Sequence, residues 1–423
     1  MADSAIPNKI GDYEIQEILG KGAFATTCKA IHVHTNLPVA IKVVEKSSLS
    51  EPNNQKRFDL EIFLLRNLHH PFIAKYFQLL EDSNFCFICM EYIENEDLYH
   101  HVNELSDKRL EEKEARYYFE QLILVLEYLH NEKKVVHRDI KGQNLVLDRG
   151  FNIKVIDFGI ANVLSNSKAK LSSLCGSLCF MAPEILAHEP YIQSVDIWSA
   201  GVLLYSLIIG TLPFYRWQRE ALIERILNVE PVFPKDFHPL LQDFLSKLLC
   251  KDPATRISIE QIKEHPWFSK DEYEYIKQNS MHLMQSEFIL GRRNVIDQEI
   301  VEKMNRMNIN TDYLKQSLKS RETNTCTISY HILAREKLVE GMKELKTKVM
   351  AQNFKQNFQK IEVAQNVQNV KNCQQVRKIQ DLKVYKLNKG RPIIILPQTN
   401  SRRYSNPAVI VCPTKKNTSK NNS

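Results

Sequence analysis

The chain has 423 residues, of which 43% are hydrophobic and 25% charged, a composition typical of a globular protein with one large domain and something smaller. Nine cysteines, an odd number without regular spacing, argue against a disulfide framework and for a reducing compartment. The longest apolar run, AGVLLYSLIIG at 200–210, is too short to span a membrane, and the first residues lack the apolar core of a secretory signal. We therefore expect a cytoplasmic protein without a transmembrane segment, with the nucleus as a second location.

The net charge of +7 is unevenly distributed. Residues 341–423 carry 17 Lys and Arg against 3 Asp and Glu, a net charge of +14, which leaves −7 for residues 1–340. We interpret the basic tail as a solvated segment; a surface for anionic lipid or nucleic acid and a substrate-like inhibitory segment are the alternatives. Because no aromatic platform or nucleic-acid motif accompanies the charge, we expect no nucleic-acid partner.

Residues 13–95 are strand-rich with one helix. The glycine-containing segment LGKGAFATT (19–27) lies between two expected strands, and the following strand, LPVAIKVV, carries Lys42. QKRFDLEIFLLRNL has apolar residues at helical spacing and carries Glu61. Glycines let backbone N–H groups approach a phosphate closely. Taken alone, however, the loop would be a simple turn, and Lys42 with Glu61 would be an ordinary surface ion pair.

The segment FCFICMEY contains Cys86 and Cys89 in a CxxC pattern, and it reads as a buried strand. No second Cys or His pair accompanies it, so we favour the strand over a redox or zinc site. From 98 to 268 the pattern is mostly helical. SVDIWSAGVLLYSLIIG is apolar nearly all round, as expected for a buried central helix.

The most informative segment is HRDIKGQNLVLDRGFNIKVIDFG (137–159), in which Asn144 follows Asp139 by five residues and Asp157 follows Asn144 by thirteen. A later segment ends in CGSLCFMAPE, and KDPATRIS and HPWF follow. Together with the glycine loop and Lys42, these motifs resemble those of eukaryotic protein kinases, GxGxxGxV, HRDxKxxN, DFG and APE, over residues 13–268. The chain departs from the pattern at Ala25, which replaces the third glycine, and at Thr27, which replaces the valine over adenine.

The resemblance implies ATP and Mg²⁺ as cofactors and a role for each motif residue. Asp139 would accept the proton of the substrate hydroxyl, Lys141 would reach the γ-phosphate, and Asn144 and Asp157 would hold Mg²⁺. Lys42, oriented by Glu61, would hold the α- and β-phosphates. The implied ATP-binding residues are Leu19, Gly20, Gly22, Thr27, Ala40, Lys42, Glu61, Met90, Glu91, Ile93, Asp97 and Asp157.

Three positions, Asp97, Gln143 and Lys141, bear on substrate choice. Asp97 corresponds to the acidic residue that meets ribose and, in arginine-directed kinases, a substrate arginine. Gln143 stands where many such kinases have glutamate, so a strong demand for basic residues is in doubt. The lysine at 141 is typical of Ser/Thr kinases and favours them over tyrosine kinases.

The resemblance also implies roles outside ATP binding. Ser177 would bond Asp139 and Lys141, and an upstream kinase would act at Ser173 or Ser172, where Arg138 would pair with the phosphate. Asp196 would tie the catalytic loop to the central helix, and Arg256 would pair with Glu184; for both, a purely structural role is expected.

Beyond 268 the expectations concern organisation. The segment 269–295 reads as a linker, and 296–337 as three short helices that resemble the ubiquitin-associated-like module of AMP-activated and related kinases. A generic three-helix extension packed behind the kinase is the alternative. We interpret 338–423 as a low-complexity tail, although Leu338, Met342, Leu345 and Val349 form an apolar stripe and IIIL (393–396) and AVIV (408–411) are β-like.

The expected fold class is therefore α+β: a 1–12 extension, a bilobal protein-kinase fold with a small β-rich N-lobe and a larger mostly helical C-lobe, the three-helix module and a largely disordered tail. The expected function is that of an ATP- and Mg²⁺-dependent Ser/Thr kinase of the calcium/calmodulin-dependent and AMP-activated group, activated by phosphorylation. The alternatives are a pseudokinase scaffold and a polo-like-type kinase. The expected partners are protein substrates, an upstream kinase and regulatory subunits.

Overall fold

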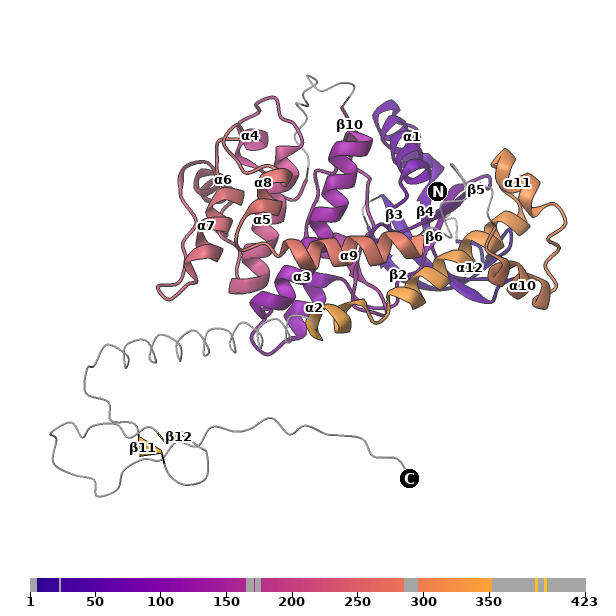
Figure 1. Ribbon diagram of the computed structural model, residues 1–423. Helices are drawn as coiled ribbons and strands as arrows, with labels where there is room; N and C mark the ends of the chain where they lie inside the picture. Colours follow the sequence, from indigo (N-terminus) through magenta and orange to yellow (C-terminus); the bar gives the residue numbers. More distant parts are fainter. Residues whose placement is uncertain are drawn as a thin grey trace. The chain divides into compact units, whose positions relative to one another are not determined.

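The computed structural model describes residues 6–22, 24–164, 171, 176–284, 296–351, 385–386 and 392–393. The chain divides into two compact units, Met1–Met350 and Ala351–Ser423. The first unit holds the expected α+β architecture of two lobes, which is confirmed (Figure 1). Of the β-like runs expected in the second unit, only Ile393 lies among the described residues, in a short antiparallel pair formed by β11 (Tyr385–Lys386) and β12 (Pro392–Ile393).

The small lobe is built on one six-stranded antiparallel sheet with the strand order β1-β2-β3-β4-β6-β5. Its strands are β1 (Lys9–Ile10), β2 (Tyr13–Lys21), β3 (Ala25–His32), β4 (Leu37–Glu45), β5 (Tyr76–Glu81) and β6 (Phe85–Glu91). Both cysteines of the CxxC pattern lie on β6, where every residue is buried. The described cysteines are free, which agrees with the buried-strand interpretation.

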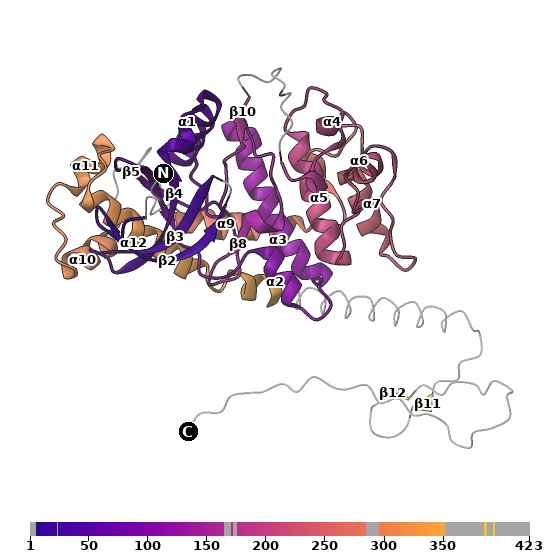
Figure 2. The same cartoon turned by 180° about the vertical axis from the view of Figure 1, so that it is seen from behind.

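One long helix, α1 (Pro52–Asn67), packs on the sheet after the short 3-10 turn η1 (Lys46–Leu49). Pro52 opens α1 at its first turn, where a missing N–H costs nothing. Phe58, Ile62 and Leu65 recur at helical spacing and are buried. This face of α1 therefore joins the main core, and Figure 2 shows the helix beside the sheet.

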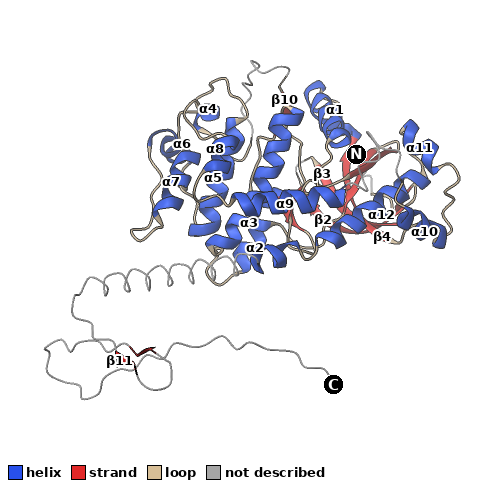
Figure 3. Ribbon diagram, viewed as in Figure 1, coloured by secondary structure: helices blue, strands red, loops and turns tan. Residues whose placement is uncertain are grey.

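The large lobe is mostly helical, as the colouring by secondary structure shows (Figure 3). Its helices are α2 (Leu98–Glu104), α3 (Glu112–Glu127), the π-helical turn η2 (Tyr128–Lys133), α4 (Pro183–Leu186), α5 (Ser194–Ile209), α6 (Arg219–Asn228), α7 (Pro239–Leu248), α8 (Ile259–Glu264) and α9 (Lys270–Leu283). The helix α5 is buried along most of its length, as expected, and ends where Gly210 adopts a φ of +82°.

Short strands and turns carry the loops between these helices. They are β7 (Val135–Val136), η3 (Gly142–Asn144), β8 (Leu145–Leu147), β9 (Ile153–Val155), β10 (Asn162–Val163) and η4 (Leu178–Phe180). Strand β8 pairs with β9, and β7 with β10. In each pair, a strand that flanks Asp139 joins a strand that flanks Asp157: β7 precedes Asp139 and β10 follows Asp157, while β8 follows Asp139 and β9 precedes Asp157.

The segment expected to hold three short helices contains α10 (Gln298–Arg306), α11 (Leu314–Ser320) and α12 (Thr325–Met342). They enclose a small core of their own, which includes Met304, Leu318 and Tyr330. A capping box between Asn324 and Thr327 starts α12. Ile328 and Ile332 of the same helix pack against the sheet of the small lobe, so α12 belongs to two cores.

Two stretches differ from the sequence-based expectation. Within the linker expected at 269–295, α9 occupies 270–283 and buries Tyr273 and Ile276 in the main core. At the start of the expected tail, Leu338, Met342, Leu345 and Val349 are buried in that same core. The apolar stripe is therefore a packing face, because its helical spacing presents all its members to one side.

No helix in the described part of the chain combines the length and the apolar character that crossing a membrane requires.

Candidate active site

The first group of site residues surrounds Lys42 on β4. Its Nζ donates to Glu61 Oε1 of α1 at 2.6 Å and lies 3.5 Å from Asp157 Oδ1, which follows β9. Three elements that are distant in sequence thus meet at one ammonium group. The structure brings together the lysine and the two carboxylates expected from the sequence.

The charges in this group stabilise one another. Burial alone would lower the pKa of Lys42, but Glu61 and Asp157 outweigh it and hold that pKa above its usual value. Burial alone would raise the pKa of Asp157, yet Lys42 and the backbone N–H of Gly159 hold it below the usual range. Both groups are therefore charged at neutral pH.

The second group surrounds Asp139, in the loop between β7 and η3. Lys141 Nζ donates to Asp139 Oδ2 at 2.6 Å and to Ser177 Oγ at 2.9 Å. Ser177 Oγ donates in turn to Asp139 Oδ1 at 2.9 Å, and Asn144 Nδ2 donates to Asp139 Oδ2 at 2.9 Å. The backbone N–H of Ser177 also donates to Oδ1, at 3.1 Å. Both carboxylate oxygens of Asp139 are thus fixed by neighbouring donors.

Asp196, in the first turn of α5, binds the backbone of the loop that carries Asp139. The fully buried Asp196 carboxylate accepts the backbone N–H groups of His137 and Arg138, each at 2.8 Å, and contacts His130 Nε2 at 2.8 Å. Arg138 has a φ of +69°, a strained value for a residue with a side chain. The two hydrogen bonds hold this conformation and so position Asp139.

The residues expected around adenine line up on adjacent strands. Ala40 of β4 lies opposite Met90 of β6, and Thr27 of β3 lies opposite Lys42. Ala40 and Met90 are buried, whereas Leu19, on β2, is 46% exposed. Ile93 follows β6 in the connection between the lobes and is partly buried.

Residues 13–268 match the family model for the protein kinase domain. The chain belongs to the protein kinase family. SNF1-related protein kinase catalytic subunit alpha KIN12 of Arabidopsis thaliana is 34% identical over 330 residues, which cover 78% of this chain and 64% of that protein. The carbon catabolite-derepressing protein kinase of Secale cereale is 34% identical over 326 residues, 76% of this chain and 63% of its own.

Serine/threonine-protein kinase SIK2 of Gallus gallus is 33% identical over 343 residues, which cover 81% of this chain and 41% of that protein. The chain therefore spans less than two thirds of the length of these three relatives. These relatives are SNF1-related Ser/Thr kinases, and the similarity of this chain to them favours the expected AMP-activated and related group over the polo-like kinases.

The other residues with expected roles are Asp97, Glu184, Arg256, Ser172 and Ser173. Asp97 caps α2, where its carboxylate accepts the backbone N–H of His100 at 3.0 Å and contacts the His100 ring at 2.7 Å. The Glu184–Arg256 pair is present and buried, with its two shortest contacts at 2.7 and 2.9 Å. Ser172 and Ser173 lie outside the described residues.

The side chain of Glu91 has a role that sequence reasoning missed. Arg335 of α12 donates from Nε to Glu91 Oε2 at 2.7 Å, and Lys154 Nζ lies 3.2 Å from Oε1. Burial alone would raise the pKa of Glu91, but these two cations hold it below its usual value. Arg335 also donates to the carbonyl oxygen of Ile73 at 2.6 Å. The kinase hinge is thereby joined to α12.

One signal in the sequence pointed to Arg335. It lies three residues after Ile332 and four before Val339, on the apolar face of a helix, where a basic residue is unusual. Such a residue is buried only when it is paired, so its position indicates an acidic partner. The identity of that partner, 244 residues earlier, has no local signal.

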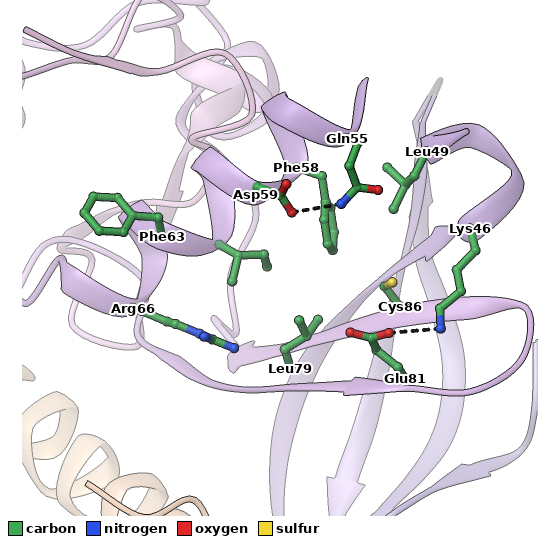
Figure 4. A pocket seen from close by; sticks show the side chains of 11 residues that line it. Lys46, Leu49, Gln55, Phe58, Asp59, Phe63, Arg66, Leu79, Glu81 and Cys86 are labelled. Atoms are coloured by element: carbon green, nitrogen blue, oxygen red, sulfur yellow. Dashed lines mark hydrogen bonds and ion pairs between the residues drawn. The ribbon is translucent and has the colours of Figure 1, made fainter. Parts of the chain in front are cut away.

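A separate depression lies between α1, the turn η1 and the strands β5 and β6 (Figure 4). Phe58, Ile62 and Leu79 are among the residues that line it, and an ion pair of 2.9 Å between Lys46 and Glu81 lies at its edge. The helix α1 therefore lines this depression and also carries Glu61, which orients Lys42.

Proposed function

We propose that this chain is an ATP- and Mg²⁺-dependent protein kinase that transfers the γ-phosphoryl group of ATP to serine or threonine hydroxyls of proteins. The observation that carries the proposal is the Asp139 group, in which Lys141, Asn144 and Ser177 hold both carboxylate oxygens. Phosphoryl transfer depends mainly on positioning and charge neutralisation, and a fixed carboxylate beside an ammonium group supplies both.

In the proposed reaction, the substrate hydroxyl oxygen bonds to the γ-phosphorus while the bond from that phosphorus to the β–γ bridging oxygen breaks, releasing ADP. The hydroxyl proton passes to the carboxylate of Asp139, which the hydrogen bonds from Lys141 and Ser177 hold in place. Lys141 contributes positive charge beside the reacting groups. Lys42, held by Glu61, contributes positive charge beside the α- and β-phosphates.

The residues around the proposed nucleotide site fit ATP and Mg²⁺. A Cβ added at Gly20 would meet no heavy atom within 4 Å, and at Gly22 the nearest is Ala25 O at 3.4 Å, so the loop leaves space for phosphates. Among the described residues, no group of three or more His, Cys, Asp or Glu could hold a metal alone. Asn144 and Asp157 supply oxygen atoms, and proteins usually bind Mg²⁺ through one or two such residues plus substrate phosphates. When bound, Mg²⁺ neutralises charge on the phosphates.

The pseudokinase alternative gains no support from this site. Pseudokinases typically lack one or more of the groups that stand here as Lys42, Asp139, Asn144 and Asp157. All four are present, and each is engaged in the hydrogen bonds described above.

We place the regulatory phosphate at Ser173, with Ser172 as the alternative position, added by an upstream kinase. Arg138, next to the catalytic aspartate, supports this, since a phosphate adds about −1.5 to −2 charges that a guanidinium can bind. In the present structure Arg138 donates to the Ile160 carbonyl oxygen at 2.5 Å and to the Tyr191 hydroxyl at 3.1 Å. Treatment with such a kinase should raise the turnover of the wild-type chain and not of Ser173→Ala. Equal activation of both would exclude Ser173.

The remaining parts of the proposal concern organisation and partners. We propose a kinase domain over 13–268, followed by a ubiquitin-associated-like module that acts on the kinase lobes; the separate core of α10–α12 supports it. Protein substrates and regulatory subunits are the proposed partners. A cytoplasmic or nuclear location is proposed from the cysteine content.

The test is phosphate transfer by the full chain from γ-labelled ATP with Mg²⁺ to a mixed library of Ser, Thr and Tyr peptides. We expect label on phosphoserine or phosphothreonine after acid hydrolysis. Label on phosphotyrosine alone, or ATP hydrolysis without labelled peptide, would contradict the proposal.

A further inference from the structure

The loop between α5 and α6, residues 210–218, exposes a tryptophan on the large lobe (Figure 1). Trp217 is 92% exposed, whereas the other two tryptophans of the chain, Trp198 and Trp267, are buried. A tryptophan side chain is usually largely buried, because exposing so large an apolar surface to water is unfavourable. Trp217 takes no part in the site described above, so the proposed reaction does not account for its exposure.

The base of this loop is fixed by packing. Phe214 is buried, and its ring stacks on Trp198 of α5 with the two ring centroids 5.5 Å apart. The Lys251 ammonium lies 4.6 Å from the centroid of the Phe214 ring. Residues 215–220, which follow Phe214, are all exposed. The loop therefore presents its exposed side chains on a well-packed support, which lowers the entropy lost when a partner binds.

The exposed residues 215–219 form a patch of aromatic and basic side chains, which we call the loop patch. The rings of Tyr215 and Trp217 meet edge to face, with their centroids 5.4 Å apart and their planes at 73°. Arg216 donates from Nη1 to the carbonyl oxygen of Tyr215 at 3.0 Å, and Arg219 is the first residue of α6. Tryptophan, tyrosine and arginine are the residues most enriched among those that dominate the binding energy of protein interfaces.

The loop patch carries positive charge that no described carboxylate neutralises. Residues 197–219 contain Arg216 and Arg219 and no Lys, Asp or Glu. Neither arginine forms an ion pair within the described ranges, and this includes Glu220, the next acidic residue along the chain. A guanidinium binds a carboxylate well, through two parallel hydrogen bonds. The patch is therefore complementary to a segment that combines carboxylates with apolar side chains.

Charge also favours a protein segment over an anionic membrane as the occupant. Recognition of anionic lipid through basic residues uses a cluster of about 4–8 Lys or Arg, and the loop patch has two. Residues 1–340 carry a net charge of −7, which a bilayer of the same sign repels. A short segment faces the loop alone, and charges farther away than about 8–10 Å are largely screened.

We propose that the loop patch is a docking surface for an acidic segment of a partner protein. Apolar side chains of that segment cover Tyr215 and Trp217, and its carboxylates bind Arg216 and Arg219. This inference goes beyond the proposed kinase function and does not depend on it.

The test uses the full chain and fluorescein-labelled twelve-residue peptides composed of Asp, Glu, Leu, Phe and Gly. A matched set has Lys and Arg in place of Asp and Glu. We expect the acidic set to bind, as measured by fluorescence anisotropy, with an affinity that falls as salt is added. The peptides contain no Ser, Thr or Tyr, so the result is independent of phosphate transfer.

Trp217 also reports on its own site. Because Trp198 and Trp267 are buried, the long-wavelength part of the tryptophan emission comes from Trp217. This emission should shift to shorter wavelength when an acidic peptide covers the ring. Trp217→Ala should abolish the shift and weaken binding about tenfold or more, as expected for a residue that dominates an interface.

Charge-reversal variants test the role of the two arginines. Arg216→Glu combined with Arg219→Glu should abolish binding of the acidic set. The matched control is Lys315→Glu combined with Lys319→Glu, which makes the same charge change on exposed residues of α11 and should leave binding unchanged. All the substituted residues are exposed, so these variants are expected to fold.

The inference is overturned if no acidic peptide binds at concentrations up to about 1 mM, or if the basic set binds equally well. It is equally overturned if Trp217→Ala and the Arg216 and Arg219 double variant bind the acidic set as the wild type does. A shift of the emission with vesicles of phosphatidylserine and phosphatidylcholine, but with no peptide, would identify a membrane surface instead and also overturn it.

Discussion

Ser177 connects the two charged members of the catalytic group. Its hydroxyl accepts a hydrogen bond from Lys141 and donates one to Asp139, so one side chain fixes the orientation of both. The resemblance of CGSLCFMAPE to the kinase motif implied this role, and the structure shows both contacts. Hydrogen bonds to charged groups are the stronger ones, so the hydroxyl should matter measurably.

Ser177→Ala is expected to lower kcat by about tenfold or more, because one hydrogen bond to a charged group contributes about 1.5–3 kcal/mol. The KM for ATP should change little, since Ser177 does not contact Lys42 or Glu61. Steady-state kinetics of Ser177→Ala and Ser177→Thr provide the comparison. Threonine keeps the hydroxyl and should retain most activity; equal turnover of the two variants would exclude this role.

At the residue scale, the site could be predicted where its members share a short motif. Asp139, Lys141 and Asn144 lie within six residues, so their spacing alone brings them together. The same is not true of Glu91, for which the sequence indicated only a backbone role. The pairing of Glu91 with Arg335 depends on the packing of α12 against the hinge, which no local pattern describes.

The helix α12 links three parts of the kinase. Ile328 and Ile332 pack on the sheet of the small lobe, and Arg335 binds the hinge residue Glu91. The next residue, Glu336, accepts a hydrogen bond from Arg149 of the large lobe at 2.6 Å. A single helix therefore contacts both lobes and the connection between them.

Arg335→Met is expected to lower the free energy of unfolding by about 3–5 kcal/mol, the usual effect of removing one partner from a buried ion pair. Arg335 is 2% exposed and Glu91 6%, so the buried carboxylate would lose its hydrogen bond to the guanidinium and keep the contact of 3.2 Å with Lys154. Urea denaturation of the purified chain gives the value.

The matched control is Lys348→Met, which breaks the exposed Lys348–Glu344 pair of 3.0 Å on the following helical segment. An exposed pair contributes about 0–1 kcal/mol, so this variant should be close to wild type. Similar losses for both variants would contradict a specific role of the buried pair.

At the element scale, the sequence predicted that the helices exist more accurately than it predicted the residues at which they end. Three helices were expected over 296–337, and α12 continues to Met342. The residues beyond 340 are rich in Asn, Gln and Lys. Because of this composition, the tail was expected to begin at 338, although the apolar stripe begins there too. Whether such a stripe is buried depends on a complementary surface, here the core of the large lobe, which no local pattern describes.

Several histidines of the first unit, whose pKa burial lowers, make stability depend on pH, and His32 and His70 are two of them. Burial lowers the pKa of His32 to about 4 and of His70 to about 3; nearby Arg335 and Lys154 also act on His70. The ordinary value is 6.5. Below that pH the unfolded chain binds protons that the folded chain does not, so stability is complete above 6.5 and is lost progressively toward the folded pKa values.

The free energy of unfolding should therefore fall between pH 6.5 and 5 by about 1.4 kcal/mol per pH unit for each histidine that stays neutral. Urea titrations at several pH values measure it. In His70→Asn the amide oxygen can still accept the Phe72 N–H that His70 accepts now, at 3.2 Å, and the slope should be shallower. A flat profile from pH 7.5 to 5 would show that these rings are protonated in the folded chain.

For the whole molecule, the division into a strand-rich and a helical lobe followed from composition and periodicity along the chain. The packing of α10–α12 against the kinase lobes was expected only in the alternative interpretation of a three-helix extension, because the pattern of 296–337 indicates three helices but not the surface that they contact. Contacts between Arg335 and Glu91, and between Glu336 and Arg149, tie that module to the kinase lobes.

The most direct test of the proposed kinase function is the turnover of Asp139→Asn beside the wild type, with nucleotide affinity measured on the same samples. Removing a general base costs about 10²–10⁴-fold in rate, so kcat should fall by at least two orders of magnitude. The Kd for ATP should stay close to wild type because Lys42, Glu61 and the glycine loop are unchanged. Equal phosphate transfer by the two proteins would contradict the assignment of Asp139 and with it the proposed mechanism.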